Sequence, residues 1–164
     1  MKTVWPVLIC AALVVTGCDE LQRLFDRSSP PPVAANDATN PDSPAYFQTE
    51  IGDTILFPVD QSILTDEAKV VLAGQAAWLV QRPQVNVLIE GHADEQGTRE
   101  YNIALGARRA ASVQAYLVEM GLTDARVRTV TYGKERPLEI CSTEDCWSRN
   151  RRAVTVVETG ATSF

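Results

Sequence analysis

The chain has 164 residues, of which 45% are hydrophobic, and this suits one globular domain with additional segments. Its formal net charge is −6, and no basic tract interrupts the acidic balance. These features argue against nucleic acid or an anionic lipid surface as the principal partner.

The N-terminus predicts an exported, lipid-anchored protein. Lys2 precedes a mostly apolar run over 4–15, which is too short to cross a bilayer because a membrane-spanning helix needs about 20 residues. A charged start, a short apolar run and small residues at its end are typical of a secretory signal, placed here at 1–17. Because Cys18 follows two small residues directly, the segment resembles a lipoprotein signal. Cleavage would leave Cys18 acylated and held on a membrane.

Residues 18–50 are predicted to connect this anchor to a folded domain. From Ser28 to Pro44 the chain consists mainly of Pro, Ala, Asn, Asp and Ser. Such a composition cannot bury a core and is typical of a flexible linker. We therefore place a single domain at 51–160.

Strand and helix patterns alternate through this domain. Alternating apolar residues predict strands at 55–59 and 85–89. Between them, Thr65 can cap a helix that has acids in its first turn and ends before Pro83. The apolar spacing predicts a second helix over 101–120, closed by the glycine that follows it.

Two further strands are predicted, at 127–132 and 152–158, separated by a long loop over 133–150. The order is therefore β-α-β-α-β-β. Strand–helix–strand units favour parallel neighbours, so the sequence predicts an α/β sandwich: a mixed sheet with both helices packed on one face.

The cysteines have different predicted fates. Cys10 leaves with the signal and Cys18 takes lipid, while Cys141 and Cys146 remain in the domain. In an exported protein, two cysteines so close together favour a local disulfide. A metal site is the alternative, although two thiolates make only part of a structural zinc set.

Candidate ligand-binding residues gather in the segment 91–102, directly after the second strand. It contains Asp94, while Asp60 follows the first strand. In open α/β sheets, ligands bind beyond the carboxyl ends of the strands. If the first two strands are parallel, both acids emerge at one edge of the sheet. The alternative is that both acids form turns or caps.

The second helix carries two neighbouring arginines with different predicted environments. On a helical wheel Arg108 faces solvent, whereas Arg109 flanks the apolar stripe and leans toward the Asp94 loop. An acid and an arginine held together can bind a zwitterion, because the carboxylate takes an ammonium and the guanidinium takes a carboxylate. A purely structural salt bridge between Asp94 and Arg109 is the alternative.

Several spaced motifs together resemble the OmpA-like peptidoglycan-binding domain, over about 52–158. The matching segments are GHADEQGTREYN at 91–102, Leu105, Arg109-Ala110, YGKE at 132–135 and NRRAV at 150–154. The resemblance implies non-enzymatic binding of uncrosslinked peptidoglycan through the meso-diaminopimelate of its stem peptides, with no cofactor or metal.

The resemblance also implies which residues contact the ligand. The principal positions fall on Asp94 and Arg109, and lesser ones on Asn102, Leu105 and Asp60. The chain departs from the family at two positions nearby: glutamine stands at 96, where an arginine is common, and valine at 59, where an aromatic residue is common.

The anchor and linker match the lipoprotein branch of this family. That branch implies an outer-membrane location, TolB and other Tol proteins as partners, and a role in holding the outer membrane to the wall during division. Asp19 after the acylated cysteine favours the inner membrane in enteric bacteria, so that membrane is the alternative location.

Two other functions compete with this one. The first is a similar lipoprotein that works outside the Tol system. The second is a periplasmic metal-dependent wall hydrolase that uses His92, the only histidine, together with Asp94 and Glu95. No nucleophile-elbow, phosphate-loop or zinc signature supports an enzyme.

The anchor can be tested directly. Changing Cys18→Ser removes the acylation site, so we expect the protein to move from the membrane fraction to the soluble periplasmic fraction, as measured by immunoblotting of fractionated cells. A variant that stayed in the membrane fraction at wild-type levels would place the anchor elsewhere.

Overall fold

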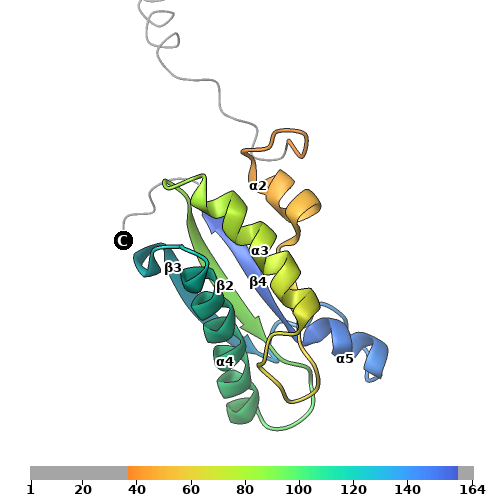
Figure 1. Ribbon diagram of the computed structural model, residues 1–164. Coiled ribbons are helices and arrows are strands. Elements are labelled where there is room, and N and C mark those ends of the chain that lie inside the picture. Colours follow the sequence, from red (N-terminus) through yellow and green to blue (C-terminus); the bar gives the residue numbers. More distant parts are fainter. Residues whose placement is uncertain (1–36, 159–164) are drawn as a thin grey trace, which may run out of the picture. The chain divides into compact units, whose positions relative to one another are not determined.

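The computed structural model describes residues 37–158, shown in colour in Figure 1. The predicted signal, Cys18, Asp19 and most of the predicted linker lie outside these residues. Within residues 37–158, no helix combines the length and apolar character needed to cross a membrane.

One four-stranded sheet and two long helices form two layers (Figure 1). The strand order is β1-β4-β2-β3; β2 pairs in parallel with β3, whereas β4 runs antiparallel to both β1 and β2. The bounds are β1 Thr54–Leu56, α3 Asp66–Val80, β2 Asn86–His92, α4 Arg99–Glu119, β3 Val127–Gly133 and β4 Arg152–Glu158. The predicted mixed sheet with α3 and α4 on one face is confirmed.

Local capping explains where the two long helices begin and end. The Thr65 hydroxyl accepts a hydrogen bond from the Ala68 amide at the start of α3, as predicted. Thr98 caps α4 in the same way, so this helix starts slightly earlier than predicted. Gly121, with φ of 105°, follows the end of α4, where a left-handed conformation favours glycine.

A single apolar core joins both layers. The inward side chains of the helices meet those of β1, β2 and β4, and the buried members include Leu72, Leu79, Val113, Leu117, Ile55, Val87, Ile89 and Ala153. The polar Gln75 is also buried, but its amide donates to the Gly52 carbonyl and accepts from the Thr155 hydroxyl. Both polar atoms of the buried Gln75 amide therefore have hydrogen-bond partners.

Packed structure begins before residue 51. Helix α2, Pro44–Tyr46, leads into the π-helix η1, Phe47–Gly52. Phe47 is fully buried, and its ring centroid lies 5.0 Å from that of Trp78 on α3. The Trp78 indole N–H also donates to the Pro41 carbonyl. Contacts with a distant tryptophan thus order residues whose local composition predicted a linker.

Two other predicted elements differ from the structure. The first strand ends at Leu56 rather than at 59, because Pro58 has no amide proton for a ladder and Asp60 adopts φ of 56°. The predicted loop over 133–150 contains the short helix α5, Glu144–Asn150.

Strand β2 and helix α4 approach each other through two glycines. A Cβ on Gly91 would lie 1.9 Å from the Gly106 carbonyl oxygen, and a Cβ on Gly106 would lie 2.5 Å from the Thr131 hydroxyl. No side chain fits between these backbones. This close approach sets α4, and therefore Arg109, against the end of β2.

We predict opposite outcomes for two glycine substitutions. Gly91→Ala inserts a methyl group into a backbone contact, so it should destabilise the domain by about 3 kcal/mol or more. Gly74→Ala is the matched control, because its Cβ would meet only the Ile51 side chain at 3.7 Å. That change should stabilise the α3 helix by roughly 0.5–1 kcal/mol. Urea denaturation measures both, and equal midpoints would contradict the close contact.

Candidate functional site

The predicted ligand-binding residues do come together at one end of the sheet. Strands β1 and β2 run in the same direction, because both are antiparallel to β4. The segments that follow them, 57–61 and 93–98, therefore emerge at the same end. The N-terminal half of α4 and the start of β4 complete this region.

Arg109 lies beneath these segments with no exposed surface. Its Nε donates to the Gln61 carbonyl at 2.9 Å, Nη1 to the His92 carbonyl at 2.8 Å and Nη2 to the Pro58 carbonyl at 3.3 Å. One guanidinium thus connects the loop after β1 to the end of β2. The predicted helical phase is confirmed, since Arg108 is exposed.

Burial lowers the pKa of Arg109 to about 10, and the nearby Asp94 carboxylate opposes this shift. Arg109 therefore remains charged at neutral pH. Its charge is compensated by carbonyl dipoles and by the field of a neighbouring acid.

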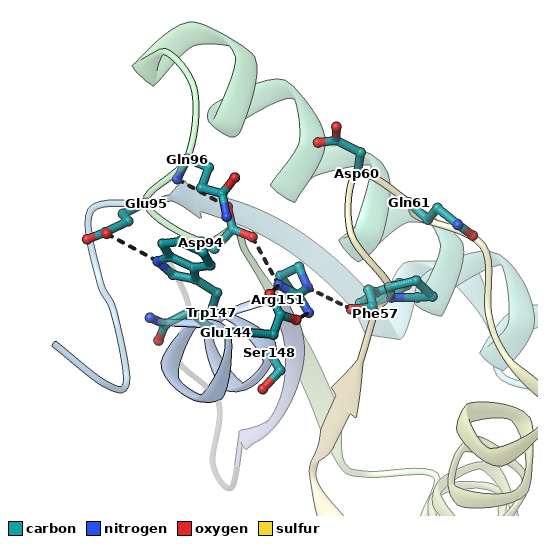
Figure 2. Close-up of polar contacts among 12 residues, drawn as sticks. Phe57, Asp60, Gln61, Asp94, Glu95, Gln96, Glu144, Trp147, Ser148 and Arg151 are labelled. Atoms are coloured by element: carbon teal, nitrogen blue, oxygen red, sulfur yellow. Dashed lines mark hydrogen bonds and ion pairs between the residues drawn. The ribbon is translucent and has the colours of Figure 1, made fainter. Parts of the chain in front are cut away.

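Asp94 is 7% exposed and accepts two hydrogen bonds. One comes from the Gln96 amide at 3.2 Å, and the other comes from Nη1 of Arg151 at 3.3 Å. Asp94 and Arg109 therefore interact electrostatically, but the arginine that contacts Asp94 is Arg151 (Figure 2). The Asp94–Arg109 salt bridge considered from the sequence is replaced by this pair.

Arg151 is the principal site residue that sequence reasoning missed. It directly precedes β4, and its side chain is 5% exposed. Its Nε donates to the Phe57 carbonyl at 3.2 Å, and its terminal nitrogens contact the carboxylates of Asp94 and Glu144. The NRRAV motif contains Arg151, and this motif was the available signal.

Helix α5 brings Glu144 to this arginine. The Cys141–Cys146 disulfide, with Cα atoms 5.8 Å apart, closes the turn that leads into α5. This bond confirms the predicted disulfide. Both thiols that the alternative metal site would need are used in it. Trp147 of the same helix donates from its indole to the Glu95 carboxylate at 3.1 Å, so α5 contacts the loop that carries Asp94 (Figure 2).

The lesser predicted residues surround the same region. Asn102 is 1% exposed and donates to the Gln96 carbonyl, but its Oδ1 has no hydrogen-bond donor among the described residues. Leu105 is buried on the same helix. Asp60 is exposed and accepts from the Tyr101 hydroxyl at 3.1 Å, and Figure 2 shows it apart from the Asp94–Arg151 pair.

His92 does not converge with Asp94 and Glu95. It is 2% exposed, and burial, followed by the charges of Arg152 and Arg136, lowers its pKa to about 4. The buried imidazole is therefore neutral at pH 7. Over residues 37–158, no three His, Cys, Asp or Glu side chains are grouped to hold a metal ion. The geometry gives no support to the predicted alternative of a hydrolase.

Comparisons with known proteins agree with the fold, and the matched residues include the segment that carries Asp94 and Arg109. A family model described as OmpA family matches residues 56–151. The peptidoglycan-associated lipoprotein of Brucella melitensis is 44% identical over 151 residues, covering 92% of this chain and 89% of the relative. The protein of that name in Rhizobium meliloti is 45% identical over 154 residues, covering 93% and 87%.

Solved structures show the same similarity. The crystal structure of the peptidoglycan-associated lipoprotein from Burkholderia pseudomallei has a TM-score of 0.66 and 35% identity, covering 76% of this chain and 99% of that one. The C-terminal domain of Helicobacter pylori MotB, which is 19% identical, has a TM-score of 0.62 over 66% of this chain and 86% of that one, and shares the fold.

We predict that Arg109 is required for stability whereas Arg108 is not. Arg109→Ala leaves three backbone carbonyls without their donor and should lower the free energy of unfolding by about 3–5 kcal/mol. Arg108→Ala, which removes the same charge from an exposed position of the same helix, should change it by less than about 0.5 kcal/mol. Equal urea midpoints for the two variants would show that the carbonyl contacts do not stabilise the fold.

Proposed function

The chain belongs to the OmpA family, and we propose on that basis that it is an envelope lipoprotein that binds peptidoglycan non-covalently. It is not an enzyme. The observation that carries the proposal is the match to peptidoglycan-associated lipoproteins along most of both chains, which includes the segment that carries Asp94 and Arg109.

The chemistry of the site supports a zwitterionic ligand. The side-chain end of meso-diaminopimelate in a peptidoglycan stem carries an ammonium and a carboxylate. Asp94 offers a carboxylate to the ammonium, and the guanidinium groups nearby favour the carboxylate. We place Asp94 and Arg109 at the centre of the site. The buried Oδ1 of Asn102, which lacks a donor among the described residues, supports an additional ligand N–H contact.

Asp60 and Leu105 complete the proposed site. Asp60 lies on the exposed turn after β1 and contributes negative charge at its rim. Leu105 is buried on α4 and supplies apolar packing beneath the proposed site. Glutamine at position 96 offers its backbone amide to Asp94, so replacement of the arginine common in the family preserves this contact with the carboxylate.

The membrane and the partners follow from the relatives. They are named lipoproteins, which supports a lipid anchor at Cys18. We propose that this anchor lies in the outer membrane, and that TolB and other Tol proteins bind the chain while it holds that membrane to the wall during division. The inner membrane, because of Asp19, and a role outside the Tol system are the alternatives.

Sedimentation with purified sacculi tests the proposal. Asp94→Asn removes the carboxylate charge but keeps a hydrogen-bond acceptor, so binding should weaken by about 2 kcal/mol or more, roughly 30-fold. The wild-type protein should sediment with sacculi without releasing muropeptides.

Glu119→Gln is the matched control, because it removes one negative charge from an exposed position at the far end of α4. It should bind sacculi like the wild-type protein. Circular dichroism checks the fold of both variants. A folded Asp94→Asn variant with wild-type affinity would overturn the assigned site, and a wild-type protein that does not sediment would overturn the function.

A further inference from the structure

We propose that a groove between β1 and α3 binds an extended, basic segment of another envelope protein, which joins the four-stranded sheet as an added edge strand. This β1–α3 groove has a volume of about 190 Å³ and is lined by Thr54, Ile55, Leu56, Thr65, Glu67, Ala68 and Val71. It shares no residue with the hydrogen bonds of Asp94 and the two buried arginines. The inference therefore goes beyond the proposed function and concerns a different surface.

Strand β1 forms one edge of the sheet, in the order β1-β4-β2-β3. The Asp53 carbonyl and the Phe57 amide, which flank the strand, are bonded to β4 and to the residue before it. Because backbone groups alternate in direction along an antiparallel pair, those of Thr54 and Leu56 point to the outer edge. Over residues 37–158 they have no backbone hydrogen-bond partner there. These groups are available to pair with another strand.

Helix α3 supplies the second wall of the groove. Ala68 and Val71 provide apolar surface on the helix, and Leu56, which is 52% exposed, provides it on the strand. An added strand would form backbone hydrogen bonds with the edge, while one of its alternate side chains entered the space beside α3. An edge strand with an adjoining apolar pocket is the arrangement by which β-strand addition achieves both affinity and specificity.

Acidic side chains near both ends of the groove favour a basic segment. Asp53 directly precedes β1. Val71 lies next to Gly52, before the strand, so Glu67, one turn earlier on α3, lies toward the other end. Within the described part of the chain, no lysine or arginine lines the groove. The complementary segment therefore has an apolar side chain between two basic ones.

The short length of β1 limits what can bind. The strand has three residues, of which Thr54 and Leu56 present outward backbone groups, and Pro58 lacks the amide proton needed to extend the edge. Two amides and two carbonyls form a small pairing surface. The affinity for an added strand therefore depends on the apolar pocket and the flanking acids together with the backbone hydrogen bonds.

The probe is the peptide acetyl-KTVTK-amide, whose valine suits the pocket and whose lysines suit the acids. The full-length protein with its lipid anchor, in detergent micelles, should bind this peptide. Because pairing protects the amides of Thr54 and Leu56, their deuterium exchange, followed by NMR, should slow about tenfold or more in the complex. An analogue N-methylated at its three internal amides keeps the side chains and charges but cannot donate, so it should bind about tenfold more weakly.

Two neighbouring valines on α3 provide a matched pair of variants. Val71→Arg fills the groove and should weaken binding of the peptide about tenfold or more. Val70→Arg is the control, because Val70 is 74% exposed and does not line the groove. This control should bind the peptide like the wild-type protein.

Glu67→Lys tests the charge at an exposed position and should weaken peptide binding about threefold to tenfold. Its control is Glu119→Lys, which makes the same change at the exposed end of α4 and should leave peptide binding unchanged. Urea denaturation checks that each variant is folded. If Val71→Arg does not fold, Glu67→Lys and the two peptides decide the outcome.

Three results would overturn the inference. One is a wild-type protein whose Thr54 and Leu56 amides gain no protection at millimolar peptide. Another is equal affinity for the N-methylated analogue, which would show that no strand is added. The third is a dimer in analytical ultracentrifugation that Val71→Arg dissociates, without protection by the peptide, which would assign the edge to a second copy of the chain.

Sedimentation with sacculi separates this inference from the proposed function. The folded Glu67→Lys variant should sediment with sacculi like the wild-type protein, since the groove shares no residue with the Asp94 contacts. Loss of sedimentation together with peptide binding would show that the two surfaces are not separate and would overturn the inference. Peptide binding that fails while the wild-type protein still sediments leaves the proposed function standing.

Discussion

The end of the sheet depends on one buried charge. Arg109 donates to two carbonyls of the loop after β1 and to one at the end of β2, and the Gly91–Gly106 approach sets its helix close enough to do so. Burying a guanidinium is costly, and the carbonyl hydrogen bonds and the Asp94 field offset that cost. The loops that carry Asp60 and Asp94 are therefore held together before any ligand arrives.

Local patterns predicted most of the fold, and long-range contacts account for what they missed. Apolar periodicity and the Thr65 cap located the long helices and strands, because these signals lie within a few residues of each other. The same periodicity distinguished Arg108 from Arg109. Phe47 is ordered by the distant Trp78, and α5 is too short for a helical period to be visible. Composition and spacing do not record such contacts.

The site was predicted in part for the same reason. The segment 91–102 marked Asp94, and the helical phase marked Arg109 as inward-facing. The partner of Asp94 was missed because Arg151 lies far along the chain, directly before the antiparallel strand β4. Only the sheet order β1-β4-β2-β3 brings that position next to the end of β2.

The two buried arginines at this end of the sheet differ in the partners they have. Arg109 donates to three backbone carbonyls, so its hydrogen bonds join the loop after β1 to the end of β2. Arg151 donates to the Phe57 carbonyl and also contacts the carboxylates of Asp94 and Glu144. Loss of either set of partners would leave a buried guanidinium uncompensated, so the position of the Asp94 loop depends on both arginines.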